Sequence, residues 1–349
     1  MLKEEFLNPD GNFPHEERPF KPVAVPNWTE HYAFFAYDDK ADSGVFIHIG
    51  RVPSAPEIWR GVLQIYQPNG EMLVAKYFGR DGTENGAGAG PLKVACIEPF
   101  RHFRAEFDGM VHRLPRAMLM AGVLLDAPSE HAAFKIDFHA RSPIMGRQAD
   151  ITEGRTDGTF HTEQIGHIEG TVTARGETVR ISGMGVRDHS CGPRHYGPVV
   201  GHLWIHALFE SGRTFSSVFY RQNTPEFVLA YLTEPDGRRD QVKIISNPRY
   251  VDTNTPPGSL ISDPVEDPQY RPFRIEFEAF GKREVLEGEM RNSHAITYVA
   301  IMEELIGTDF TRPDAVQMAD AAAVFTLSGE KGVGLFERSA RISMLKRPG

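Results

Sequence analysis

Cysteine is scarce in this sequence, with only Cys96 and Cys191 among 349 residues. Two cysteines cannot form the disulfide framework of a small secreted protein. Long hydrophobic runs are also missing, because no stretch approaches the roughly 18 apolar residues that a membrane-spanning helix needs. The N-terminal segment MLKEEF lacks the apolar stretch of a secretory signal peptide. These absences predict a cytoplasmic protein without a membrane span.

An excess of basic residues, which is typical of proteins that bind nucleic acid, is absent from this sequence. The chain has 38 lysines and arginines against 47 aspartates and glutamates, for a formal net charge of −9. Because phosphate backbones require a basic footprint, we expect no nucleic-acid partner. Hydrophobic residues make up 40% of the chain, which is enough for a full core and argues against disorder. A length of 349 residues predicts two domains or one large one.

Helical periodicity is almost absent, and only residues 118–125 and 314–323 are candidates for helices. Short runs of alternating apolar residues dominate instead, as at Phe103, Ala105 and Phe107. Such alternation indicates a strand with one buried and one wet face. The chain is therefore predicted to be all-β, either a sandwich or a barrel. Glycine-containing turns separate the runs at residues 69–70, 108–109, 175–176, 211–212, 236–237 and 329–330.

Motifs that bind cofactors or activate nucleophiles are missing as well. No Gly-Lys-Ser or Gly-Lys-Thr follows the main glycine-rich run, so nucleotide binding has little support. The Gly-x-Ser-x-Gly motif that presents a nucleophilic serine is also absent. His202 and His206 have the i, i+4 spacing of zinc-binding helices, but their segment reads as a strand. Asp188, His189 and His195 could supply metal ligands on a loop, without a diagnostic pattern. We therefore expect neither a metal nor an organic cofactor.

The most informative stretch is residues 183–194, GMGVRDHSCGPR. It places two cations, a carboxylate, an imidazole and a hydroxyl between glycine and proline breaks. Asp188 and His189 could act as acid or base. Arg187 or Arg194 could hold a developing oxyanion. The alternative is a buried polar junction, in which the two arginines pair with the carboxylate and the imidazole binds a backbone carbonyl.

The segment that follows reads as a strand with one polar and one apolar face. Because residues two apart share a face, His202, Trp204 and His206 point the same way. Leu203, Ile205 and Ala207 point the other way. Two imidazoles and an indole could form the wall of a pocket for a planar apolar ligand, to which a returning strand adds Tyr220. The alternative is a face exposed to solvent.

The signature Gly-x-Gly-x-Arg-Asp-His-Ser-x-Gly-x-Arg resembles that of a bacterial family related to the carotenoid 1,2-hydratases and the AttH-like proteins. Weaker matches lie at residues 28–35, 163–170 and 332–337. Cys191 stands where we expect a tryptophan in that family. The resemblance implies two lipocalin-like antiparallel β-barrel halves packed together, with a ligand cavity within or between them. We place the halves at residues 1–175 and 176–349, with the signature in the second.

Glu337 lies in the last of these matches, near the C-terminus. Closure of the second barrel would bring a last strand beside a first, so Glu337 could reach Asp188 and His189. A carboxylate and an imidazole in an apolar pocket have the shifted pKa values that proton transfer near neutral pH requires. The alternative for Glu337 is an ion pair with Arg338 or Arg341 at the end of the barrel.

Together with the resemblance, these patterns indicate an enzyme that acts on a hydrophobic small molecule of the terpenoid, polyketide, steroid-like or aromatic kind. Its chemistry would be acid–base catalysis without a cofactor, as in a lyase that hydrates or dehydrates its substrate, or in an isomerase. The alternative is a non-catalytic carrier of hydrophobic ligands. The residues leave the oligomeric state open, a homodimer included. The predicted catalytic residues are Asp188, His189, Glu337 and Arg187, and the predicted ligand-binding residues are Arg194, His195, His202, Trp204, His206, Tyr220 and Gln164.

Overall fold

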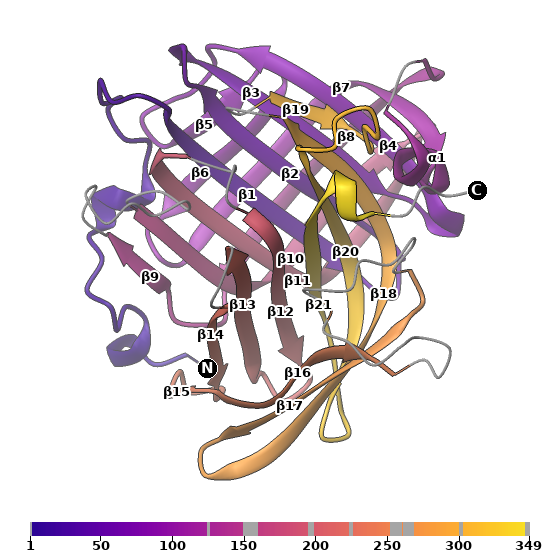
Figure 1. Cartoon of the computed structure of the whole chain (residues 1–349). Coiled ribbons are helices and arrows are strands. Elements are labelled where there is room, and N and C mark those ends of the chain that lie inside the picture. The colour runs from indigo at the N-terminus through magenta and orange to yellow at the C-terminus, as the bar shows by residue number, and fades with distance from the viewer. Residues whose placement is uncertain are drawn as a thin grey trace. The chain divides into compact units, whose positions relative to one another are not determined.

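Two compact units make up the chain, and each is built on one large sheet of antiparallel strands (Figure 1). The structure is a computed structural model that describes residues 2–123, 126–148, 160–194, 199–222, 226–251, 260, 269–299 and 303–345. The first unit comprises residues 1–115 and 126–196, and the second comprises residues 116–125 and 197–349. The predicted all-β fold is confirmed.

The first unit is a closed antiparallel barrel. Its sheet has 11 strands: β1 (Trp28–Asp38), β2 (Ser43–Val52), β3 (Ala55–Tyr66), β4 (Glu71–Gly79), β5 (Gly86–Ala89), β6 (Leu92–Glu98), β7 (His102–Pro115), β8 (Ser129–Ala140), β9 (Met145–Gln148), β10 (Phe160–Ala174) and β11 (Glu177–Pro193). The strands follow the order β4-β3-β2-β1-β11-β10-β8-β7, and β4 also pairs with β7. This last pairing joins the two ends of the path, which gives the up-and-down barrel of a lipocalin-like fold.

Period-two alternation explains the interior of this barrel. Tyr32, Phe34 and Ala36 of β1 belong to one hydrophobic core, and so do Val45 and Ile47 of β2. Large side chains fill the space within the ring, as expected for a small barrel. The residues between them on each strand point to the outer face of the sheet.

The second unit repeats the plan. Its sheet has 10 strands: β12 (Val199–Phe209), β13 (Thr214–Gln222), β14 (Glu226–Thr233), β15 (Arg239–Gln241), β16 (Lys243–Tyr250), β17 (Pro272–Ala279), β18 (Lys282–Val299), β19 (Glu303–Ile306), β20 (Val316–Leu327) and β21 (Glu330–Arg341). The order is β15-β14-β13-β12-β21-β20-β18-β17-β16, and β19 pairs with β18. The last strand, β21, therefore lies beside the first strand, β12, as barrel closure predicts.

Short helices complete the described part of the chain: η1 (Glu4–Phe6), η2 (Pro14–Glu17), η3 (Pro68–Gly70), α1 (Arg116–Ala121) and η5 (Ile342–Met344). The helix predicted at residues 118–125 corresponds in part to α1. The helix predicted at residues 314–323 is wrong, because β20 occupies most of that range. Ala321, Ala323, Phe325 and Leu327 alternate into the core, so the alanines there have the period of a strand. No helix among the described residues is long and apolar enough to span a membrane.

The structure divides the chain at a different place from the one expected. Arg175 and Gly176 both have positive φ, 53° and 75°, and form the tight turn between β10 and β11. A boundary at 175/176 would separate two strands that pair along their whole length, from Ala174 opposite Glu177 to Phe160 opposite Cys191. The compact units part between residues 196 and 197 instead. The signature therefore belongs to the first unit.

Candidate functional site

The signature strand β11 sends its polar side chains to two different faces. Arg187 lies opposite Phe34 and His189 lies opposite Tyr32, both of which point into the barrel. Asp188, between them, points to the outer face. The predicted acid–base pair of Asp188 and His189 is therefore split by the sheet, and β11 does not belong to the sheet that contains Glu337.

Arg187 is held inside the first barrel by a carboxylate and an amide. Its guanidinium lies 2.6 Å from Glu17 Oε2 and donates to Gln164 Oε1 at 2.9 Å. The ring of Phe103 packs against it, with its centroid 4.3 Å from Arg187 Cζ. Gln164 in turn donates to the backbone oxygens of Phe100 and Ser142. Arg187 therefore occupies a fully partnered position in the barrel interior, paired with Glu17 and not with Asp188 as the junction hypothesis expected.

His189 belongs to a second polar group inside the same barrel. Its Nε2 lies 3.0 Å from Glu30 Oε1, and its ring stacks on Tyr32 with centroids 4.0 Å apart. Arg51 donates to the other oxygen of Glu30 at 2.7 Å and lies over the ring of Trp59. Burial, together with the negative charges of Glu30 and Glu17, raises the pKa of Tyr32 well above its ordinary value. Sequence reasoning missed Glu30 and Arg51, which lie far from the signature in the chain.

The outer face of the first sheet carries Asp188 and Ser190 of the signature. Asp188 contacts His161 of β10, and Arg194 donates to the hydroxyl of Ser190. Cys191 lies two residues after His189 and shares the inner face with it, where it packs with Trp28 and Phe160 in a small apolar cluster. His195 lies outside the described residues.

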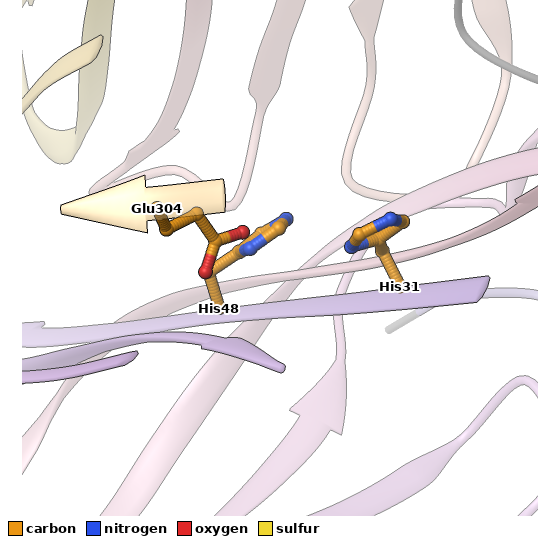
Figure 2. A group of neighbouring side chains, drawn as sticks. All are labelled: His31, His48 and Glu304. Carbon is orange, nitrogen blue, oxygen red and sulfur yellow. The ribbon is translucent and has the colours of Figure 1, made fainter. Parts of the chain in front are cut away.

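Two further imidazoles, His31 and His48, stand on this outer face on neighbouring strands (Figure 2). Their rings stack with centroids 4.8 Å apart. Gly50 makes room for the first ring, because a Cβ there would lie 2.3 Å from His31 Nδ1. Burial and the nearby charges of His48, Arg194, Arg60 and His189 lower the pKa of His31 well below its ordinary value.

The second unit contains the face predicted for β12. Leu203, Ile205 and Ala207 belong to the barrel core, so the alternation places His202, Trp204 and His206 on the opposite face, as predicted. Trp204 and His206 meet edge to face with centroids 4.8 Å apart, and Ser216 lies 2.8 Å from His206 Nδ1. Tyr220 of β13 meets His202 edge to face with centroids 5.9 Å apart. Trp204 is buried, so this face is not the solvent-exposed surface of the alternative interpretation.

Four side chains form a row across adjacent strands on this same face. Glu337 of β21 lies opposite Trp204 of β12 and opposite Asp320 of β20. Asp320 lies opposite His294 of β18. The Nδ1 atom of His202 is 2.9 Å from Glu337 Oε1, and His294 Nε2 is 3.1 Å from Asp320 Oδ2. Two imidazoles thus flank two carboxyl groups, and we call these four residues the His–Glu–Asp–His row.

The two carboxyl groups in the row are driven to opposite protonation states. Burial, the charge of Glu337 and a hydrogen bond to it raise the pKa of Asp320 well above its ordinary value. Burial alone would raise the pKa of Glu337 too, but hydrogen bonds from His202, Asp320 and Ser339 hold it below its ordinary value. Burial also lowers the pKa of His294 well below its ordinary value. The row therefore presents a charged carboxylate next to a neutral carboxylic acid near neutral pH.

Sequence reasoning found Glu337 and His202 but missed Asp320 and His294. Both missed residues interrupt runs of small and apolar residues, at 318–323 and at 293–296. Because burying a polar group is costly, a single polar residue in such a strand marks a candidate site residue. The alternative was an ion pair of Glu337 with Arg338 or Arg341; the side chains that bind Glu337 in the structure include His202, Ser339 and Asp320.

Two hollows on the surface of the first unit have volumes of about 490 and 380 Å³. The larger one has charged walls that include Lys93, Glu106, Asp108 and Lys135. The predicted site residues line neither hollow. Charged walls of this kind do not suit a hydrophobic ligand.

Comparison with known proteins gives a family and a shared fold. A family model described as a domain of unknown function (DUF7064) matches residues 13–292. No curated protein matches the sequence. A putative AttH from Nitrosomonas europaea is 12% identical, with a TM-score of 0.56 over 92% of this chain and 98% of its own.

Two other solved structures are similar over nearly their whole length. CghA, solved with Sch210972, is 14% identical with a TM-score of 0.51 over 100% of this chain and 99% of its own. Kievitone hydratase from Nectria haematococca is 10% identical with a TM-score of 0.51 over 97% of this chain and 95% of its own. At these identities the likeness establishes the double lipocalin-like fold.

Proposed function

Because the chain belongs to the DUF7064 family, whose description assigns no activity, we propose its function from its own residues: it is an enzyme that transfers protons to and from a hydrophobic small molecule without an organic cofactor. The observation that carries this proposal is the His–Glu–Asp–His row. In this row a buried carboxylate and a buried carboxylic acid stand side by side. Groups whose environments push their pKa values apart are suited to paired acid and base roles.

The row supplies both partners of a proton transfer. Glu337 is the base, because its pKa is lowered and it stays charged near neutral pH. Asp320 is the acid, because it retains its proton where an ordinary aspartate has lost it. His202 holds the Glu337 carboxylate by a hydrogen bond of 2.9 Å and so orients it. Addition of water to a double bond, its elimination, and migration of a double bond each need one group that takes a proton and one that gives a proton.

The neighbours of the row supply the surface for an apolar substrate. The ring of Trp204 lies opposite Glu337 on the next strand, with His206 against its edge. Tyr220 adds a phenol beside His202. Aromatic walls with a few polar groups are typical of sites for planar or polycyclic small molecules. We propose a substrate of the terpenoid, polyketide, steroid-like or aromatic kind.

The named relatives support this proposal at the level of reaction class. Kievitone hydratase is a hydratase by name, and CghA was solved with the small molecule Sch210972. Both share the fold of this chain, so the fold accommodates such chemistry. We accordingly propose a lyase of the hydratase or dehydratase type, or an isomerase. We assign Arg187 and His189 to the support of the first barrel and not to the chemical step.

The test is conversion of a pooled library of hydrophobic metabolites, followed by mass spectrometry in H₂O and in D₂O. We expect one compound to gain or lose water, or to take up deuterium without other change in mass. Glu337→Gln should lower the rate by roughly 10²–10⁴-fold, the usual worth of a general acid or base. Glu278→Gln is the matched control, because Glu278 is an exposed carboxylate on the same sheet.

Two outcomes would contradict the proposal. Equal rates for the wild type and Glu337→Gln would remove Glu337 from the mechanism. Binding of a library compound without conversion or deuterium uptake would identify the protein as a carrier of hydrophobic ligands.

A further inference from the structure

A second convergence of titratable groups lies on the outer face of the first sheet. His161 and Glu163 are two residues apart on β10, so they share a face. Glu163 lies directly opposite Asp188 on β11, and His161 lies opposite Ser190. One imidazole and two carboxylates therefore meet at one place, independent of the His–Glu–Asp–His row.

The three groups are close enough to hold one ion. One ligand atom from each of His161, Glu163 and Asp188 lies within 4.8 Å of the others. The Nε2 atom of His161 contacts Asp188 Oδ2 and lies 3.3 Å from Glu163 Oε1. Ligand atoms around 2.0–2.2 Å from a zinc ion stand about 3–4 Å apart, so small side-chain movements complete the set.

Charge balance favours a cation at this place. The carboxylates of Glu163 and Asp188 both approach the same atom, His161 Nε2. The Asp188 side chain is nine-tenths buried, and its Oδ2 accepts no hydrogen bond of good geometry among the described residues. A buried carboxylate oxygen without a hydrogen bond is costly, and a divalent ion would satisfy it together with its neighbour.

We infer that His161, Glu163 and Asp188 form a binding site for a divalent transition-metal ion of the zinc type. A nitrogen ligand with two carboxylate oxygens suits this class better than calcium or magnesium, which prefer oxygen ligands throughout. The side chains of His161 and Glu163 are 24% and 15% exposed, so an ion can reach them. Three protein ligands leave at least one position for water. Sequence reasoning named Asp188 as a possible ligand but grouped it with His189 and His195, and it did not consider His161 and Glu163 of the neighbouring strand.

The experiment is a zinc titration of the chelator-treated full chain by isothermal calorimetry. The wild type should bind one ion, and His161→Gln should lose at least about tenfold in affinity, since even the loss of an outer partner of a ligand costs that much. Glu163→Gln is a second variant, at a ligand position less buried than Asp188. Both variants should keep the circular dichroism spectrum of the wild type.

Two histidine variants serve as controls in the same titration. His167→Gln changes another half-buried imidazole of β10 and should bind zinc like the wild type. His48→Gln changes the stacked pair on β1 and β2. Undiminished affinity in His161→Gln and Glu163→Gln, or a loss confined to His48→Gln, would overturn the assignment.

Discussion

Asp320 and Glu337 stand directly opposite each other on β20 and β21, and both carboxyl groups are buried. Two negative charges at such a place would repel strongly, so the pair holds one proton between them. The directions of their pKa shifts place that proton on Asp320 and the charge on Glu337. The stability of the protein should therefore depend on pH through this pair.

Asp320→Asn should become more stable relative to the wild type as the pH rises. The wild-type fold keeps Asp320 protonated at pH values where the unfolded chain, with an ordinary pKa of 3.8, has lost that proton. Stability from Asp320 is therefore lost as the pH rises toward the folded pKa, by at most about 1.4 kcal/mol per pH unit. Asparagine does not titrate, so the difference in melting temperature should grow as the pH rises above about 4. Asp314→Asn, at an exposed position, is the control, and its difference in melting temperature from the wild type should not change with pH. If the difference for Asp320→Asn is equally constant, the two carboxyl groups do not share a proton.

His294→Gln should remove an acid sensitivity of the wild type. Burial keeps His294 neutral in the fold, whereas the unfolded chain takes up a proton near pH 6.5. The contribution of His294 to the free energy of unfolding is therefore complete above pH 6.5. It is lost as the pH falls toward the pKa of His294 in the folded state. Urea unfolding at a series of pH values should show the advantage of the wild type shrinking below about pH 6.5. His15→Gln, on the exposed N-terminal segment, should leave the pH profile unchanged.

Glu17→Gln should destabilise the first barrel severely, by about 3–5 kcal/mol, because the buried Arg187 loses its carboxylate partner. Glu5→Gln, at an exposed glutamate of the same N-terminal segment, should have little effect. The measurement is thermal unfolding followed by circular dichroism. If Glu17→Gln unfolds like Glu5→Gln, Arg187 does not depend on this carboxylate.

Gly334→Ala should destabilise the second barrel by about 1–3 kcal/mol, the usual cost of forcing a methyl group into a packed place. A Cβ at Gly334 would lie 1.8 Å from the backbone oxygen of His206 on β12, so the two strands would have to separate. Gly122→Ala is the control, because a Cβ there meets nothing within 4 Å. Equal melting temperatures for the two variants would contradict the close approach of β12 and β21.

Alternation along single strands was the part of the fold that sequence could predict. It placed His202, Trp204 and His206 on one face and Leu203 and Ile205 in the core, and the structure agrees. The same rule, applied to β11, would have separated Asp188 from His189. The motif instead suggested one site because its residues are adjacent in the chain.

The remaining features depend on which strands become neighbours. Asp320 and His294 join Glu337 only through the pairing of β18, β20 and β21, which no local pattern specifies. The partners Glu17 and Glu30 reach β11 from the N-terminal part of the chain for the same reason. The resemblance to a double-barrel family supplied the architecture, but it could not place the boundary between the units.

The seventeen residues of β11 leave no freedom for a change in chain length. Deleting one residue before Arg187 would reverse every side chain that follows, so Asp188 would enter the barrel among Glu17 and Glu30 while Arg187 and His189 would leave it. Three carboxylates would then share the interior, and Glu17 would have lost its partner Arg187. Length variation among homologues should therefore concentrate in the turns, and this strand should be conserved in length even where its residues differ.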